Sequence, residues 1–247
     1  MKSICYDVHH AIARRWFLAA LIATTVALYL SVGQATYGLI GYLESYELFE
    51  ENSFGYSMTD MLTMGMKGDF GLLTLPALSA LPFAAQALHE IKSGAIRPAV
   101  FRTGRKNWII GKVAGCVISG MLLQGAAVGL LFLILNGLTV AMIRQGFPWG
   151  EGGDFWPMLL RRMLCGGIWA GVGCVIALAT ETASAAYLAP LCLCYALMMI
   201  GTRFFPDAMM LNPTQWVSGS TWFLTIVLAF TLALQALSLK RGVQKYA

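Results

Sequence analysis

Several apolar runs that approach or exceed twenty residues constrain this chain more strongly than any other feature. A helix needs about twenty apolar residues to cross a hydrocarbon layer roughly 30 Å thick. The chain has 247 residues, of which 58% are hydrophobic and only 12% are charged. A transmembrane β-barrel would instead show alternating segments of about ten residues. The sequence therefore predicts an all-α integral membrane protein.

Windows of about nineteen residues place six transmembrane helices along the chain. The break between the fourth and fifth spans depends on Glu181, which alone interrupts the apolar character of residues 179–190; without that break the count is five. Pro76, Pro82 and Pro190 fall within spans two and five, where they either loosen the helix toward a cavity or form packed kinks. The predicted spans lie near 16–40, 70–89, 109–142, 157–180, 184–202 and 219–238.

The charged residues divide unevenly between the two sides that six spans create. One side carries twelve lysines and arginines against three acids, a net charge of +9, and the other carries five against nine, a net charge of −4. Lysine and arginine near span ends tend to stay cytoplasmic. Both termini and residues 89–112 are therefore predicted to be cytoplasmic. Arg161 and Arg162 fall on the acidic side, where they are expected to snorkel to the outer interface or to face a wet cavity.

Two flanking segments complete a single predicted membrane domain, residues 1–247. Residues 1–15 carry apolar side chains at helical spacing, which predicts an amphipathic helix lying along the inner leaflet. Residues 203–218 mix aromatic side chains with prolines, and we expect this external segment to pack on the outer mouth of the bundle.

Polar and small residues within the spans admit more than one interpretation. Glycine pairs four apart, at 111 and 115, 125 and 129, and 167 and 171, favour close helix packing or a dimer seam. The polar side chains within the spans either line a transport path or satisfy hydrogen bonds between helices, and they include Thr24, Thr25, Gln34 and Gln124.

The chain carries no recognisable catalytic, nucleotide or metal site. No glycine-rich phosphate loop is present, so we do not expect the chain to hydrolyse ATP by itself. Paired intramembrane carboxylates are absent, and the six cysteines predict neither a disulfide framework nor a zinc site. Glu181 is assigned to a cytoplasmic turn. No cofactor is expected on this chain, and no nucleic-acid partner.

The segment HEIKSGAIRPAVFRTGRKNWIIGK, residues 89–112, concentrates seven charged residues between two apolar runs. Ile96, Val100 and Phe101 are interleaved with Arg97 and Arg102, a pattern typical of a short helix that lies across a membrane face and docks into a groove. A positive-inside anchor or a patch for anionic lipid explains the charges equally well.

This segment resembles the connection between the second and third spans of ATP-binding-cassette type-2 permeases. That family has an acidic residue at the end of span two, a glycine four residues later, a short helix, basic residues, and Gly-Lys at the start of span three. The proline and serine usual before the basic residue are missing, and Pro98 falls where the helix should continue, which predicts a helix that is shorter or starts later. The residues that match are Glu90, Gly94, Arg102, Arg105, Gly111 and Lys112.

Other parts of the chain agree with the same family. They are the amphipathic lead-in, the six spans with both ends inside, the Asn-Pro-bearing external segment FPDAMMLNPTQW at 205–216, and the basic tail. The resemblance implies a permease subunit in the bacterial inner or plasma membrane, paired with an identical or related subunit above two soluble ATPase subunits. ATP and Mg²⁺ would bind those partners.

The resemblance also assigns roles within the chain. Residues 90–108 would be the cytoplasmic coupling region that seats in a groove of the ATPase, and the implied substrate is an amphiphilic or hydrophobic compound for export, such as a peptide, a bacteriocin or a drug. An ATP-independent polytopic protein, either a secondary transporter or a membrane scaffold, is the alternative. The implied coupling residues are Glu90, Lys92, Ser93, Gly94, Ile96, Arg97, Phe101, Arg102 and Arg105.

Overall fold

The computed structural model is helical throughout the residues that it describes, which are 9, 12, 15–45, 57–143, 150, 153–205 and 211–246. Most of the predicted lead-in, residues 1–15, and part of the external segment, residues 206–210, lie outside the described residues. The elements are α2 (Arg15–Ser45), α3 (Met58–Lys67), α4 (Asp69–Ala80), α5 (Gln86–Lys92), α6 (Ile96–Thr103), α7 (Arg105–Ile143), α8 (Phe155–Thr180), α9 (Ala185–Phe204), the 3-10 turn η2 (Pro213–Gln215) and α10 (Thr221–Tyr246).

Within these residues, five helices are long and apolar enough to cross a membrane: α2, α7, α8, α9 and α10. They confirm a multi-pass helical membrane protein. Glu181 ends α8 in the left-handed conformation, with φ 55°, and the chain turns there before α9 begins. The break between the fourth and fifth predicted spans is therefore present.

The second predicted span, 70–89, is not one continuous helix. It consists of α4 and α5, joined by a hydrogen-bonded turn over residues 81–85. Pro82 lies in this turn and has no backbone N–H to donate, which explains why the regular helix stops here. Pro76 and Pro190, by contrast, are buried inside α4 and α9, which continue through them as packed helices.

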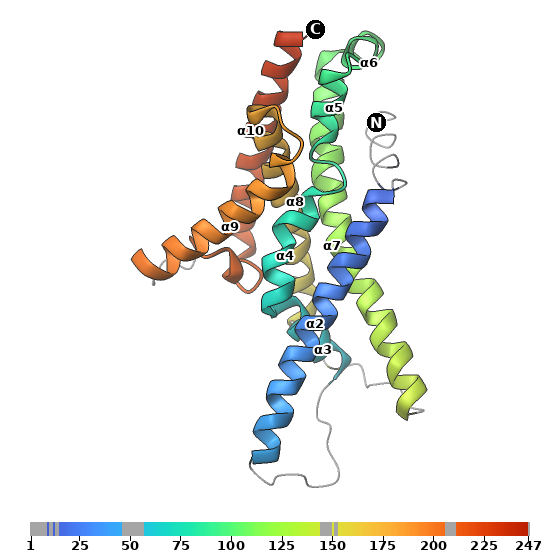
Figure 1. The fold of residues 1–247 in the computed structure, drawn as a ribbon, viewed down its shortest axis with the longest axis vertical. Coiled ribbons are helices and arrows are strands. Elements are labelled where there is room, and N and C mark those ends of the chain that lie inside the picture. The colour runs from blue at the N-terminus through green and yellow to red at the C-terminus, as the bar shows by residue number, and fades with distance from the viewer. Residues whose placement is uncertain are drawn as a thin grey trace.

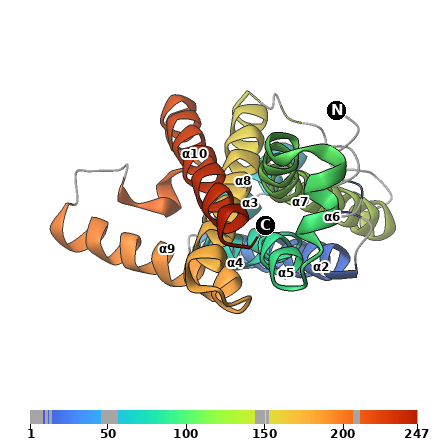
Figure 2. The same cartoon turned by 90° about the horizontal axis from the view of Figure 1, so that it is seen from above.

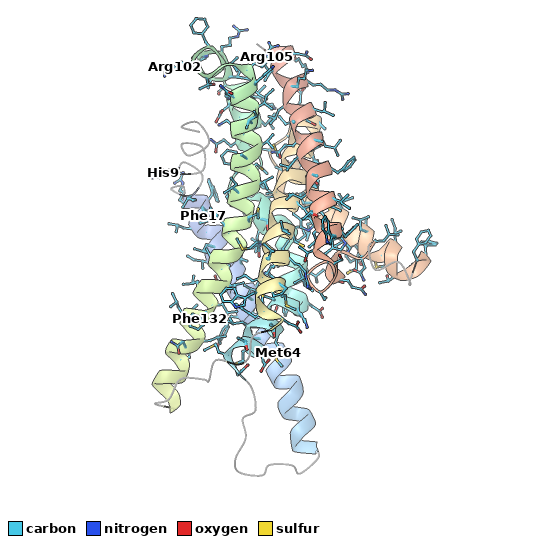
Figure 3. The ribbon with its side chains drawn as sticks, turned by 180° about the vertical axis from the view of Figure 1, so that it is seen from behind. His9, Phe17, Met64, Arg102, Arg105 and Phe132 are labelled. Atoms are coloured by element: carbon cyan, nitrogen blue, oxygen red, sulfur yellow. The ribbon has the colours of Figure 1, made fainter. Side chains whose placement is uncertain are left out.

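The helices run back and forth along one long axis, so each end of the molecule gathers particular connections (Figure 1). The α5–α6–α7 connection and the C-terminal end of α10 lie at the same end, and α3 lies toward the other. Seen from behind, Arg102 and Arg105 mark the first end, whereas Met64 lies far below them (Figure 3). We refer to these as the α6 end and the α3 end.

Helix α8 is the most buried of the five long helices and packs closely against α7. The closest approach is between two glycines, because a Cβ built on Gly120 would lie 2.5 Å from the carbonyl oxygen of Gly166. Gly167 and Gly171 also allow no added Cβ without a shift of neighbouring atoms, which agrees with the close packing predicted for that pair. Gly129 meets nothing within 4 Å, so the prediction does not extend to every glycine pair.

The described part of residues 203–218 packs on the bundle, and its place on the outer side stays a prediction. Trp216 is buried and stacks on Trp169 of α8 with ring centroids 5.7 Å apart. Helix α9, which precedes this segment, leans away from the other helices (Figures 1 and 2) and exposes Leu188 and Tyr195.

Candidate functional site

The turn between α5 and α6 depends on a glycine at its corner. The N–H groups of Ser93 and Gly94 donate to His89 O and Ile91 O at 2.9 and 3.3 Å, which closes the end of α5. Gly94 has φ +73°, a conformation that side chains with a Cβ rarely adopt. The chain therefore changes direction at the glycine that the sequence singled out.

Helix α6 has eight residues and ends at a second glycine of this kind, Gly104, with φ +79°. Pro98 is its third residue. The first N–H groups of a helix have no intrahelical acceptor, so a proline in the first turn removes no hydrogen bond. Helix α6 begins two residues before Pro98, so the proline does not prevent the helix from forming.

The two faces of α6 have different surroundings. Ile96 is fully buried among the apolar residues of the α6 end, which include Ile91 and Trp108. Phe101, on the other face, leaves 94% of its surface exposed. Ile96 therefore anchors α6 to its own bundle, which corrects its predicted place on a docking surface.

Glu90 joins α5 to α7 through an ion pair. Its Oε1 accepts from Lys112 Nζ at 2.7 Å and from Gln86 Nε2 at 3.0 Å, and the side chains of Lys112 and Glu90 are only 4% and 23% exposed. The ammonium group also lies 5.6 Å from the centroid of the Phe83 ring. The acidic residue and the Gly-Lys lysine that carry the resemblance, Glu90 and Lys112, thus contact each other. We call this contact the Glu90–Lys112 clamp.

A second set of contacts joins α5 to α10. Lys92 Nζ donates to the backbone oxygen of Glu181 at 2.5 Å, and Lys245 Nζ donates to the Glu181 carboxylate at 2.6 Å. Glu181 lies in the α8–α9 turn, so it links the helix before α6 to the last helix of the chain. The sequence predicted this turn but not its two lysine partners.

The outer surface of the connection is cationic with one large apolar side chain. Throughout residues 91–107 the exposed charged side chains are all basic, and Phe101 is the one exposed aromatic. An apolar anchor ringed by cations suits a complementary acidic surface with an apolar pocket. The predicted site residues exposed here are Lys92, Ser93, Gly94, Arg97, Phe101, Arg102 and Arg105.

No protein-family model and no curated protein matches this chain. The proposed function therefore rests on the arrangement of the residues of this chain.

Sequence reasoning gave Arg162 no partners, and the structure supplies them. Its side chain is fully buried at the α3 end. Nη1 donates to Met66 O at 2.9 Å, Nη2 donates to Gly71 O at 3.0 Å, and Nε donates to Gln124 Oε1 at 3.2 Å. It neither snorkels nor faces a wet cavity, so both expectations for this residue were wrong.

Arg162 therefore connects α3, α4, α7 and α8 in one polar centre, which Gln124 extends by donating to Ser79 Oγ at 2.8 Å. Gln124 thus takes the hydrogen-bonding role that was one of its two alternatives, whereas Thr24 and Thr25 donate to carbonyls of their own helix. The side chain of Gln34 lies outside the described part of the chain. The signal for Arg162 was a cation on the acidic side of the predicted topology.

Arg161, next along α8, has different surroundings. Its guanidinium donates to the carbonyls of Val217 and Ser218 at 3.4 and 3.1 Å, and to Thr221 Oγ1 at 3.3 Å. It ties α8 to the segment before α10. The two adjacent arginines thus bind different parts of the molecule: Arg161 the segment before α10, and Arg162 the helices α3, α4 and α7.

Proposed function

We propose that this chain is the membrane subunit of an ATP-binding-cassette type-2 exporter, and that α6 docks on a soluble ATPase subunit. The observation that carries the proposal is the exposure of Phe101, 94%, on a short helix that lies across one end of a membrane bundle. An isolated surface phenylalanine needs no explanation by itself. Here it sits between exposed Arg97 and Arg102, on a helix whose opposite face is anchored by Ile96.

The links around α6 would carry a displacement into the membrane. A displacement of α6 would be passed first to α5, which precedes it. From α5 it would reach α7 through the Glu90–Lys112 clamp, and α10 through Lys92, Glu181 and Lys245. Gly94 and Gly104 bound α6 on both sides, so α6 can tilt without unwinding its neighbours. ATP and Mg²⁺ would bind the ATPase, and its closure would re-pack the spans of two permease subunits, identical or related.

The proposal includes a sixth crossing and a direction. Helices α4 and α5 follow each other along the bundle (Figure 1) and together would form the second crossing. The α6 end, with both termini, would be cytoplasmic in a bacterial inner or plasma membrane. The substrate class would be an amphiphilic or hydrophobic compound, such as a peptide, a bacteriocin or a drug, moved outward.

Capture of an ATPase tests the docking assignment. The probe is a soluble ATPase with a phosphate loop encoded beside this chain, co-expressed with the full-length protein and co-purified in detergent. We expect Phe101→Ala and Arg102→Glu to reduce capture at least tenfold, because a buried aromatic anchor and a complementary charge are each lost. Phe204→Ala, at another largely exposed phenylalanine on α9 (72% exposed), is the matched control.

Unchanged capture by Phe101→Ala and Arg102→Glu would contradict the docking assignment, as would an equal loss with Phe204→Ala. Sidedness is tested separately with cysteines introduced at Arg102 and Thr63, which lie on α6 and α3. In sealed right-side-out membrane vesicles, an impermeant thiol reagent should label only the cysteine at position 63. Labelling at position 102 alone would reverse the topology.

One observation favours the ATP-independent alternative. A secondary transporter often combines a broken membrane helix with a buried charge, and this chain has the α4–α5 break and Arg162. However, Arg162 already donates to three oxygens of its own chain. Substrate efflux that persists in vesicles depleted of ATP would favour the alternative.

A further inference from the structure

A small cavity at the α6 end includes the Lys92–Glu181–Lys245 contacts in its lining. It has a volume of about 180 Å³ and lies between α5, the α8–α9 turn and the last turns of α10. Its inner wall is apolar, formed by Leu88 and Ile91, which are 3% and 4% exposed, together with Leu178. A purely polar ligand would gain nothing from such a wall, so the occupant should carry an apolar part.

The cavity lies near the ends of two helices that are long and apolar enough to cross a membrane. Leu178 belongs to the last turn of α8, and Ser238 belongs to α10. A helix that leaves a hydrocarbon core of roughly 30 Å enters the layer of lipid headgroups. A cavity at the end of such a helix would be open to a lipid headgroup from the side.

Three cations converge on the rim of the cavity. Arg241 and Lys245 are one helical turn apart on α10, and Lys92 comes from the end of α5. Glu181 is the one carboxylate among the lining residues, so the cations outnumber it three to one. Because Lys92 and Lys245 both donate to Glu181, their ammonium groups are already held at one point before any ligand binds.

We propose that this cavity binds the phosphate of an anionic phospholipid, with the acyl chains lying along the apolar wall and into the bilayer. The volume equals that of about six water molecules in the liquid, at roughly 30 Å³ each, which suits a phosphate with part of its glycerol. Basic pockets between membrane helices suit such headgroups. The proposal needs a membrane-embedded chain but not an ATPase partner, so it stands apart from the proposed function.

The test uses the full-length protein in detergent, with native mass spectrometry to count retained phosphatidylglycerol or phosphatidylcholine. We expect the wild-type chain to retain phosphatidylglycerol in preference to phosphatidylcholine. Arg241→Gln and Lys92→Gln should each weaken phosphatidylglycerol binding about fivefold, the effect of one cation near a lipid phosphate. Lys240→Gln removes the same charge from the same helix outside the cavity, and should leave binding unchanged.

Glu181→Gln is the decisive variant, because it should act in the opposite direction. It removes the competing carboxylate while keeping the backbone oxygen that accepts from Lys92, so phosphatidylglycerol binding should rise by a few fold. A folding defect cannot produce a gain.

Three results would overturn the proposal. The first is equal retention of the two lipids. The second is an equal loss with Lys240→Gln and Arg241→Gln, which would show a diffuse charge effect. The third is displacement of the lipid by millimolar inorganic phosphate, which would assign the cavity to free phosphate instead.

Discussion

The two ends of the molecule each bury a cation, and they satisfy it in different ways. At the α6 end, Lys112 pairs with a carboxylate, Glu90, at 2.7 Å. At the α3 end, Arg162 donates to neutral oxygens from α3, α4 and α7. An ammonium is a compact charge that one counterion can satisfy, whereas a guanidinium spreads its donors over a rigid fork. The lysine therefore joins two helices, and the arginine joins four.

The α3 end also offers Arg162 a favourable electrostatic position. Met66 is the penultimate residue of α3, so its carbonyl is among the last four of that helix, which lack intrahelical donors. The negative end of the helix dipole lies at the same place. A buried cation without a carboxylate is thus stabilised by the end of a helix.

Two glycines at each end differ in the room around them. At the α3 end, a Cβ on Gly68 would overlap the Ser31 side chain, and one on Gly71 would lie 3.0 Å from Gly65 O. At the α6 end, a Cβ on Gly94 or Gly104 would meet nothing within 4 Å. Close packing therefore requires glycine at the first two positions, whereas a positive φ requires it at the other two.

The largest expected effect is at Arg162. Arg162→Leu removes the donor from three buried oxygens, and the two that lie outside regular helical pairing, Met66 O and Gln124 Oε1, each cost about 1–3 kcal/mol. We expect a loss of about 4 kcal/mol in the free energy of unfolding, and a fall on the order of 10 °C in the thermal midpoint in detergent. Arg162→Lys should lie between, because one ammonium cannot reach all three oxygens. Arg203→Leu, at an exposed position of α9, is the control. Equally small losses of stability in Arg162→Leu and Arg203→Leu would contradict the structural role of Arg162.

Arg162 shows how far the sequence could predict this site. Its charge on the acidic side of the topology marked it as unusual, which a sequence can reveal. Its acceptors lie 96 and 91 residues away on two short helices, and no local pattern encodes that proximity. Glu90 and Lys112 were likewise found as two separate positions, while their contact across 22 residues was not.

In the fold, too, properties of single segments were predicted from the sequence, whereas contacts between segments were not. Long apolar runs predicted six spans, and five of them are helices long and apolar enough to cross a membrane, because length and composition are properties of each segment alone. The close approach of α7 and α8 at Gly120 and Gly166 was missed, because the two glycines lie on different helices and form no spaced pair. The break in the second span follows from Pro82, whose effect the sequence left open between a loosened and a packed helix.

The second prediction concerns the Glu90–Lys112 clamp. Lys112→Met removes the cation from a mostly covered carboxylate, and Glu90→Gln removes the counter-charge of a buried ammonium, so each should cost about 2–3 kcal/mol. The double variant should be less destabilised than the sum of the two, by about 1–2 kcal/mol, since residues in contact are coupled. Thermal unfolding of the four proteins measures this difference. Lys106→Met, exposed on the same helix, should change little, and additive single effects would mean that the clamp is not a stabilising pair.

The third prediction isolates backbone strain at the ends of α6. Gly94→Ala and Gly104→Ala meet no atoms within 4 Å, so the positive φ alone should cost about 1–3 kcal/mol at each position. Gly129→Ala also enters open space, but in a regular helix, where alanine should stabilise by about 0.5–1 kcal/mol. The thermal midpoint should therefore fall in Gly94→Ala and Gly104→Ala and rise in Gly129→Ala. A loss at Gly129 would show that space, and not conformation, decides these substitutions.

The smallest expected effect is at the start of α3, the helix whose other end Arg162 closes. Ser57 Oγ donates to Asp60 Oδ2 at 2.6 Å and its backbone N–H donates to the same oxygen at 3.0 Å; these bonds lower the pKa of Asp60 from its ordinary value of 3.8. A carboxyl whose folded pKa is lowered stabilises the protein fully above its unfolded pKa, and loses that contribution as the pH falls through the folded pKa. Asp60→Asn should therefore lower the thermal midpoint slightly at neutral pH, by less than about 1 kcal/mol at this exposed position.

In acid below the lowered pKa of Asp60, the wild-type and Asp60→Asn proteins should unfold together, because the wild-type carboxyl is then neutral as well. Asp154 lines a surface pocket together with Asp60 and Ser57, and Asp154→Asn is the matched control for the loss of one carboxylate there. A difference between wild type and Asp60→Asn that persists in acid would assign the effect to lost hydrogen bonding. If the difference disappears in acid, α3 is stabilised by the Asp60 carboxylate at one end and by the Arg162 guanidinium at the other. Only the contribution of Arg162 is then independent of pH.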